Sequence, residues 1–587
     1  MLAPDQRSTL TEHLRLPDDA TLLHAMATTF SLDLFAALLP PLALSSDTAD
    51  LRDPMRVLAA VRNRIDQIDI FHQAGQVPAP RNPESKLFTL LEPAIHAVIP
   101  PPGRLFHPKL WFICWEQEGS QYSRLVVSTR NLTWDSSWDA VVSLDGTVET
   151  RNRTKNEPLL RIFDYATENL VLPLPPARRK ALTELRERIH RTAWAGLEQV
   201  EEFRFHALSR RSAKPDMSGT RQLIVSPFLG GRTVTRVKDA GRGELHLVST
   251  QAAIDLIEPD TLRGVRAYAF DPLVGRTETD GTDSAVPAPA SSRLHAKLYC
   301  VERGFKAHLF IGSANATDAA FGGNIEFLLE LVGPKRVMGI DQLLGENGFG
   351  KVLTETSPTV GSAEQDDAER ELAAALRALA THAMRATVTD SDDGDAYTVT
   401  LTGQVPPDHA PWSALTCAPL TRTTLERAID QRTPFGVAFE GLSLVDLTGF
   451  FLFRAKNGSA EASTVIQAEL IGAPEDHAER VLSAMIGSPE AFVRLVYLLL
   501  AFGSSPLPEP MDPESITDED GRAIAGEAPL VGLFETILRA MTRSPTALDR
   551  LTPIVESIIA AGAQPPVLPI GFAEFWNSVT HARKAAS

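Results

Sequence analysis

The sequence has little cysteine, no long apolar run and no positive net charge. Its 587 residues include only three cysteines, Cys114, Cys300 and Cys417, which are too few and too scattered for a disulfide framework or a zinc site. No run approaches the roughly 20 apolar residues that span a bilayer. Residues 1–15 also lack the basic-then-apolar order of a secretory signal. We therefore expect a cytoplasmic protein without stable membrane association, and we expect neither a cofactor nor a bound metal.

The net charge of −17 is unevenly distributed along the chain. Residues 361–587 hold 31 acidic and 16 basic residues, so residues 1–360 carry a net charge of only −2. Proteins that bind phosphate backbones do so with lysine and arginine. The first part of the chain is therefore compatible with a nucleic-acid partner, although the whole chain is acidic.

The pattern of apolar runs and turn residues divides the chain into four segments. Residues 1–175 and 219–355 read as two α/β lobes, joined by a helical connector at 176–218. Residues 356–587 read as a mixed, largely helical accessory domain with an acidic, proline-rich linker at 504–529. Strands are predicted at 94–99, 105–115, 124–128, 222–228, 244–249, 265–270, 294–301, 307–311, 327–332, 395–404, 434–454 and 462–470. Helices are predicted at 177–199, 364–384, 475–503 and 528–562.

An internal repeat carries the chemistry. Each copy has a His-x-Lys motif in an apolar stretch, followed by a second apolar stretch that ends in a small-residue turn with asparagine. The interval from His107 to Asn131 is similar to, and slightly longer than, the interval from His295 to Asn315. If both motifs lie in strands, the histidine and the lysine of each project from the same face. We therefore expect His107 to act with Lys109, and His295 with Lys297.

The duplicated residues suit a tetrahedral anion. Ser128-Thr129 and Gly312-Ser313 allow a tight turn whose backbone N–H groups can approach an anion closely. Two lysines and two amides around one point would hold the anion, and two imidazoles would supply paired acid and base groups. Phosphoryl transfer needs this combination, and the lysines could neutralise its charge without a metal.

These residues resemble the half-sites of the phospholipase D superfamily. The second copy follows the family pattern closely through His295, Lys297, Gly312-Ser313, Asn315, Asn324 and Glu326. The first copy is more similar to the tyrosyl-DNA phosphodiesterase branch, with Ser128-Thr129-Arg130-Asn131 and a nearby tryptophan. Asp139 follows Asn131 more closely than Glu326 follows Asn315. The resemblance implies a pseudo-symmetric pair of α/β/α sandwich lobes.

The resemblance also implies a role for each residue. His107 would attack phosphorus to form a phosphohistidine, and His295 would act as the general acid and base. Lys109, Lys297, Asn131 and Asn315 would bind the non-bridging oxygens, and Glu326 and Asp139 would orient the histidine of the other half. Substrate contacts are expected from Ser128, Thr129, Ser313, Asn324, Trp134 and Trp138.

Three functions compete at this point: a metal-independent nuclease or DNA-processing enzyme, a phospholipid hydrolase or phosphatidyl transferase, and a non-catalytic interaction protein. The first half-site and the nearby tryptophans favour the nuclease. The segment 29–34 is similar to one found in bacterial proteins associated with phage defence, whose loci also encode helicases. That similarity implies antiviral defence and a helicase or translocase partner.

Overall fold

The computed structural model describes most of the chain. The described residues are 10–45, 54–80, 85–133, 137–270, 294–345, 348, 350–358, 367–391, 396–405, 411–430, 434–486, 488–501, 533, 537–538, 545–561, 568–569 and 571–586.

The first lobe is built on a seven-stranded sheet with the order β3-β2-β1-β4-β5-β6-β7. Neighbours among β1, β2 and β3 run parallel, and the pairs from β1–β4 through β6–β7 are antiparallel. Ala25 and Ala27 belong to one buried cluster and Met26 to another, because successive side chains of a strand point to opposite faces. Its strands are β1 (Thr21–Thr29), β2 (Ile68–Gln73), β3 (Ile95–Val98), β4 (Leu110–Gln117), β5 (Ser120–Ser128), β6 (Val141–Val148) and β7 (Thr192–Trp194).

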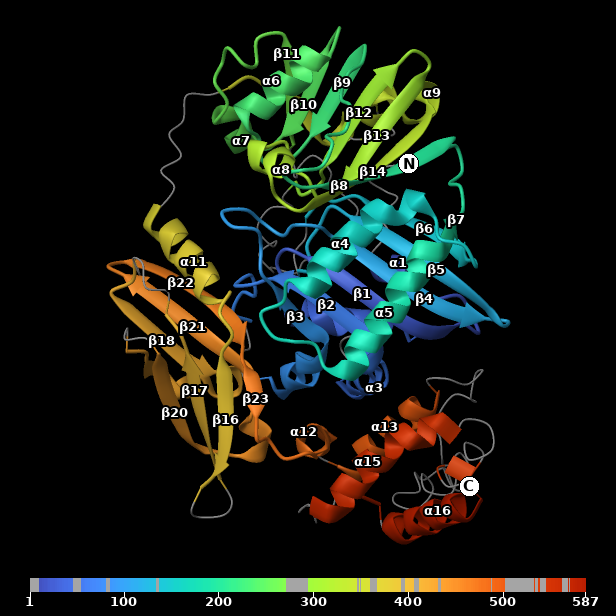
Figure 1. Ribbon diagram of the computed structural model, residues 1–587, viewed down its shortest axis with the longest axis vertical. Helices are drawn as coiled ribbons and strands as arrows, with labels where there is room; N and C mark the ends of the chain where they lie inside the picture. The colour runs from blue at the N-terminus through green and yellow to red at the C-terminus, as the bar shows by residue number, and fades with distance from the viewer. Residues whose placement is uncertain are drawn as a thin grey trace, which may run out of the picture.

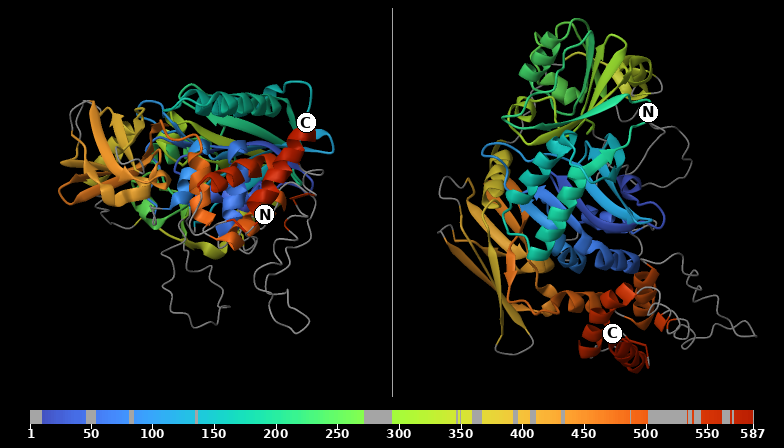
Figure 2. Two further views of the ribbon diagram at one scale, coloured as in Figure 1. Left: turned by 90° about the horizontal axis from the view of Figure 1, so that it is seen from below. Right: turned by 45° about the vertical axis from the view of Figure 1, so that its right-hand side comes forward.

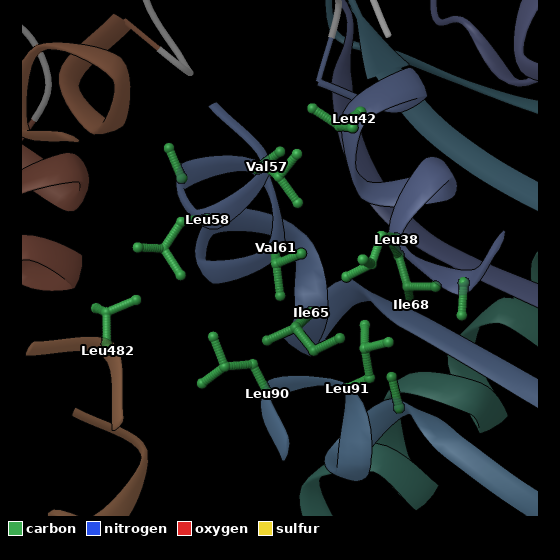
Figure 3. Packing of buried hydrophobic residues seen from close by; sticks show 14 of the residues in the cluster. Leu38, Leu42, Val57, Leu58, Val61, Ile65, Ile68, Leu90, Leu91 and Leu482 are labelled. Atoms are coloured by element: carbon green, nitrogen blue, oxygen red, sulfur yellow. The ribbon is translucent and has the colours of Figure 1, made fainter. Parts of the chain in front are cut away.

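Helices cover both faces of this sheet. α4 (Glu157–Glu168) and α5 (Pro176–Arg191) lie over one face (Figure 1). The other face is covered by α2 (Leu39–Ala43), α3 (Pro54–Arg64) and the 3₁₀ segment η3 (Lys86–Ala94). Figure 3 shows Ile65 near Leu90 and Leu91 of η3, and Val61 on the side of Leu38. The first lobe is therefore an α/β/α sandwich.

The second lobe repeats this plan on an eight-stranded sheet, with the order β15-β11-β10-β9-β12-β13-β14-β8. Neighbours among β9, β10 and β11 run parallel, and β12, β13 and β14 are antiparallel, so β9 corresponds to β1 and β12 to β4. Helices α6 (Gly231–Ala240), α7 (Gln251–Asp255) and α8 (Asp318–Gly322) cover one face, and α9 (Lys335–Met338) and α10 (Ile340–Leu344) pack on the other. The strands are β8 (Glu202–Leu208), β9 (Arg221–Val225), β10 (Leu245–Ser249), β11 (Val265–Phe270), β12 (Leu298–Arg303), β13 (Lys306–Gly312), β14 (Glu326–Pro334) and β15 (Leu353–Glu355).

The two lobes share one buried cluster. Phe112 and Leu125 of the first sheet belong to the same cluster as Val225 and Leu298 of the second. Residues 176–218, predicted as a helical connector, are helical only as far as Arg191. β7 then completes the first sheet and β8 completes the second, because the edges of both sheets supply backbone partners for the chain as it crosses.

The accessory domain has two four-stranded sheets, β20-β17-β16-β23 and β19-β18-β21-β22. α11 (Asp367–Leu379) is shorter than the predicted helix, because β16 begins at Arg385. The helices α12 (His477–Ile486), α13 (Pro489–Ala501), α15 (Pro545–Ala561) and α16 (Phe572–Ala586) follow the strands. The strands are β16 (Arg385–Asp390), β17 (Tyr397–Gly403), β18 (Ala414–Pro419), β19 (Arg427–Ala428), β20 (Phe435–Leu442), β21 (Phe450–Asn457), β22 (Ala460–Gln467) and β23 (Glu469–Ile471).

The accessory domain packs against the first lobe. Its strands lie beside that lobe and its last helices beneath it, away from the second lobe (Figure 2). Leu482 of α12 and Leu58 of α3 belong to one cluster and lie near each other in Figure 3. The fold class is therefore a pair of α/β lobes with an added mixed domain, as predicted. The predicted linker at 504–529 lies outside the described residues. Within the described part of the chain, none of the helices combines the length and apolarity needed to span a bilayer.

Candidate active site

Both His-x-Lys motifs lie just before a strand, where the backbone of each lobe touches the other lobe. β4 begins at Leu110 and β12 at Leu298, so the prediction that the motifs lie in strands of their own sheets is wrong. The reason is that their backbone groups pair between the lobes. His107 N–H donates to Ile325 O at 2.9 Å, and His295 N–H donates to Trp138 O at 2.7 Å. Each motif is thus held by the opposite lobe.

The small-residue turns occupy equivalent positions in the two lobes. The Thr129 hydroxyl accepts from Ala140 N–H at 2.8 Å, and the Ser313 hydroxyl accepts from Phe327 N–H at 2.9 Å. Thr129 therefore corresponds to Ser313, and its neighbour Ser128 corresponds to Gly312. This equivalence explains how the first half-site can depart from the Gly-Ser pattern and still form the same turn.

The glycine of the second turn is required by a close approach. A Cβ at Gly312 would lie 2.1 Å from Phe327 O, well inside van der Waals contact. The first turn accommodates Ser128, whose hydroxyl accepts from Arg130 N–H at 3.0 Å. The two half-sites therefore differ in how closely the neighbouring strand approaches the turn.

Glu326 fixes the orientation of His107. Glu326 Oε2 accepts from His107 Nδ1 at 2.8 Å, and both side chains are buried. The Ser313 hydroxyl donates to the same carboxylate oxygen, and Asn324 Nδ2 donates to Oε1 at 3.3 Å. Because the carboxylate accepts the Nδ1 proton, the lone pair of His107 lies on Nε2. Burial lowers the pKa of His107 to about 4 despite the opposing effect of Glu326, so this imidazole is neutral near pH 7.

Two buried lysines accompany the histidines. Lys109 Nζ donates to His107 O at 2.8 Å, and Lys297 Nζ donates to His295 O at 2.8 Å and to Thr129 O at 3.2 Å. Burial lowers the pKa of Lys297 to about 7, against the opposing effects of Glu326 and Asp139. Burial and the charge of Lys297 lower the pKa of Lys109 well below its usual value. A bound anion would favour the charged form of both amines.

His295 is held by the first lobe. Its Nδ1 lies 3.0 Å from Thr129 O and 3.1 Å from Lys297 Nζ. A carbonyl oxygen can only accept, so the tautomer with its proton on Nδ1 donates to Thr129 O and leaves Nε2 for acid–base work. His295 is partly exposed, whereas His107 is buried. Asp139, the expected partner of His295, is partly buried and influences Lys297 electrostatically.

The two asparagines occupy equivalent turns and share one unusual property. Within the described residues, Asn131 Oδ1 and Asn315 Oδ1 are both buried without a hydrogen-bond partner. An unsatisfied buried acceptor costs about 1–3 kcal/mol, and a catalytic role is one of the explanations for such a group. The side-chain oxygens of Asn131 and Asn315 therefore lack a hydrogen-bond partner in both half-sites.

Trp138 lies in different surroundings from the substrate-contacting position expected for it. The Trp138 ring lies 5.6 Å from that of Phe270 and packs against the shared core of the lobes. Core packing therefore accounts for its position, and Trp134 lies outside the described residues. Phe30, which no motif indicated, has its ring centroid 5.1 Å from that of His107 and 6.0 Å from Lys109 Nζ. In the sequence, Phe30 could be noticed only as part of the apolar stretch that forms β1 and the following turn.

The site draws its positive charge from side chains. Among the residues that the structure describes, no group of three or more histidine, cysteine, aspartate or glutamate side chains is arranged to hold a metal ion. Lys109 and Lys297 supply cationic groups next to the two imidazoles, and both lysines are almost fully buried. Together the half-sites bring two buried amines, which a bound anion would charge, next to two imidazoles held at Nδ1, and this combination suits a tetrahedral oxyanion.

Comparison with known proteins gives structural neighbours only. No known family model and no curated protein matches the sequence. A yeast tyrosyl-DNA phosphodiesterase structure is similar at 10% identity and a TM-score of 0.35, over 56% of this chain and 86% of that one. The polyphosphate kinase from Porphyromonas gingivalis is similar at 13% identity and a TM-score of 0.33, over 61% of this chain and 49% of the kinase. At such identities and TM-scores the function has to be inferred from the chain's own site.

Proposed function

We propose that the chain is a phosphodiesterase of the phospholipase D type that acts through a covalent phosphohistidine. The observation that carries this proposal is the 2.8 Å contact between His107 Nδ1 and Glu326 Oε2. It leaves a neutral imidazole nitrogen directed away from the carboxylate, in a buried site that also holds Lys109 and Lys297.

In the first step His107 Nε2 attacks phosphorus. A P–N bond forms while the bond from phosphorus to the leaving oxygen breaks, and His295 Nε2 donates a proton to that oxygen. Lys109, Lys297, Asn131 and Asn315 hold the non-bridging oxygens, where negative charge is concentrated. Glu326 stabilises the positive charge that develops on the attacking imidazole.

In the second step water releases the phosphoryl group. His295, now neutral at Nε2, takes a proton from a water molecule whose oxygen attacks phosphorus. The P–N bond breaks and returns the electron pair to His107. We assign Asp139 the positioning role for His295 that Glu326 has for His107, with Ser128, Thr129, Ser313 and Asn324 holding the two turns.

The substrate that we favour is nucleic acid, most simply DNA, which makes the protein a nuclease or DNA-processing enzyme. The support is the hydroxyl-rich first turn and the nearly neutral charge of residues 1–360, compared with the acidic remainder. We further propose cytoplasmic action in antiviral defence with a helicase or translocase that delivers DNA. The three cysteines are buried free thiols, as expected of a reducing compartment.

The first test is an activity panel. Single-stranded DNA, duplex DNA, RNA and phosphatidylcholine vesicles would be incubated in excess EDTA with the wild type and with a His107→Ala/His295→Ala double variant. Cleavage of nucleic acid by the wild type alone supports the proposal. Release of choline without any cleavage of nucleic acid would instead favour a phospholipid hydrolase, and a strict requirement for added Mg²⁺ would contradict the lysine-based mechanism.

The second test identifies the nucleophile. The His295→Asn variant should accumulate a phosphoryl adduct on His107, whereas His107→Ala should form none. The adduct would be detected by mass spectrometry of peptides prepared without exposure to acid. His382→Asn, in the accessory domain, is the matched control and should turn over normally. An adduct on His295 in the His107→Ala variant would reverse the two roles.

A further inference from the structure

The loops that follow β1 and β9 are built in the same way. The Thr29 hydroxyl accepts from Leu132 N–H at 3.0 Å and donates to Ser31 O at 2.8 Å. The Ser226 hydroxyl accepts from Ala316 N–H at 3.0 Å and donates to Phe228 O at 2.7 Å. Each loop therefore pairs with the residue directly after a site asparagine, and Phe228 occupies the position that Ser31 occupies in the first lobe.

The two loops differ in where they place an aromatic ring. In the first lobe the ring of Phe30 lies against His107, and the next residue is a serine. In the second lobe the position equivalent to Phe30 is Pro227, and the next residue, Phe228, is 60% exposed. An exposed phenylalanine loses the burial energy that normally holds this residue inside a protein. The second lobe thus presents a ring to solvent at the loop position where the first lobe has the hydroxyl of Ser31.

A cavity of about 800 Å³ lies on the same lobe, directly after this loop. Arg232 lines it from the start of α6, followed one turn later by Arg236, whose guanidinium lies 4.8 Å from the centre of the Phe321 ring. Neither arginine forms an ion pair within the described part of the chain, although Asp239, Glu258 and Asp318 also line the cavity. Two like charges four residues apart on a helix repel each other. An anion between the guanidinium groups would remove that repulsion.

If the proposed function holds, the leaving-group side of the substrate lies over the second lobe. In an in-line displacement the leaving oxygen lies opposite the attacking His107, and it receives its proton from His295. His295, Asn315 and the Phe228 loop all belong to the second lobe. On this mechanism the leaving group would depart over the second lobe, the lobe that also carries Phe228 and the arginine-lined cavity.

We infer that the second lobe carries a leaving-group subsite for a single-stranded nucleic acid. The first base on the leaving side stacks on Phe228, and the following phosphates contact Arg232 and Arg236. Base stacking on an aromatic side chain tolerates any sequence, and it requires an unpaired base. The preferred substrate is therefore a strand that continues for at least two nucleotides beyond the cleaved bond.

A pair of substrates separates this inference from the proposed function. The first is a nucleotide p-nitrophenyl ester, whose leaving group is too small to reach Phe228, and the second is a single-stranded oligonucleotide. Phe228→Ala should lower kcat/KM for the oligonucleotide about tenfold and leave kcat/KM for the ester unchanged. Phe228→Trp should retain oligonucleotide cleavage. Phe305→Ala, which removes an 88% exposed ring at the β12–β13 hairpin, is the matched control and should change neither.

The outcomes are distinct. If the wild type cleaves neither substrate, the proposed function fails. If the wild type cleaves both and Phe228→Ala affects neither, the leaving-group subsite is absent. An equal loss on both substrates would mean that Phe228 supports the catalytic turn, and this would also overturn the inference.

The arginines are tested through salt dependence. Arg232→Gln/Arg236→Gln should reduce the slope of log kcat/KM against log salt concentration by about 1.4 for the oligonucleotide, since each phosphate contact on a single strand contributes about 0.7. Lys335→Gln/Arg336→Gln removes the same charge from α9, at the opposite end of β14, and should leave the slope unchanged. Equal slopes for the two double variants would contradict the path across α6.

Discussion

Glu326→Gln isolates the role of the carboxylate that holds His107. The side chains are nearly equal in size, so the buried packing is retained. In the variant the amide oxygen would stand at the Oε1 position and accept from Asn324, and the amide NH₂ would stand at the Oε2 position, which His107 and Ser313 now share. The amide NH₂ would then face His107 Nδ1 as a donor, forcing the imidazole proton onto Nε2, where it blocks attack on phosphorus.

The expected loss follows from the charge that develops on His107. A carboxylate about 4 Å from an imidazolium contributes ~4 kcal/mol at an effective dielectric constant of ~20. Each ~1.4 kcal/mol corresponds to a tenfold change in rate, so we expect kcat to fall by about 10³. Stopped-flow measurement of phosphohistidine formation under single-turnover conditions would locate the loss in the first step.

The matched control is Glu330→Gln. Glu330 lies on the same strand, is also buried, and contacts His206 at 2.8 Å and His308 at 2.7 Å. This variant should lose stability and keep the rate constant of phosphohistidine formation. The mechanism is refuted if Glu326→Gln, folded by circular dichroism, forms the phosphohistidine within threefold of the wild-type rate.

Three further predictions concern stability and anion binding. Gly312→Ala should lower the free energy of unfolding by about 1–3 kcal/mol, because the new Cβ would overlap Phe327 O; Ser128→Ala serves as the control in thermal denaturation and should have a smaller effect. Sulfate should bind more weakly as pH rises through about 7, because Lys297 loses its proton there. Calorimetry at pH 6 and pH 9 would measure the change in affinity. A Lys297→Met variant that kept the full pH dependence would contradict this prediction. The contacts with His206 and His308 outweigh burial and lower the pKa of Glu330 to about 2. The stabilising contribution of Glu330 is therefore complete above about pH 4.5 and is lost as pH falls toward 2. Urea titrations over this range should show that loss in the wild type and not in Glu330→Gln.

The half-sites could be predicted from the sequence because their residues lie close together along the chain. His295, Lys297, Asn315 and Glu326 all fall within one continuous segment that ends where β14 begins, and the strand pattern between them sets their relative order. The duplication then required two similar lobes, which the structure confirms.

Contacts between distant segments could not be predicted in the same way. The motif backbones pair with Ile325 and Trp138 of the opposite lobe, about 220 and 160 residues away in sequence. β2 carries Asp69 and Gln73, which read as polar although both are buried. Asp69 accepts from His24 at 2.7 Å, and Gln73 accepts from Phe106 N–H at 2.8 Å, so their partners lie far from β2 along the chain.

The active site is a consequence of how the lobes dock. His107 of the first lobe is oriented by Glu326 of the second, and His295 of the second is held by Thr129 and Trp138 of the first. The lobes also share one buried cluster, so separating them would expose apolar surface and release both imidazoles together. If the proposed function holds, neither half-site should be active alone. Because the accessory domain packs on the first lobe, a partner bound there would act on the site by changing how the first lobe meets the second.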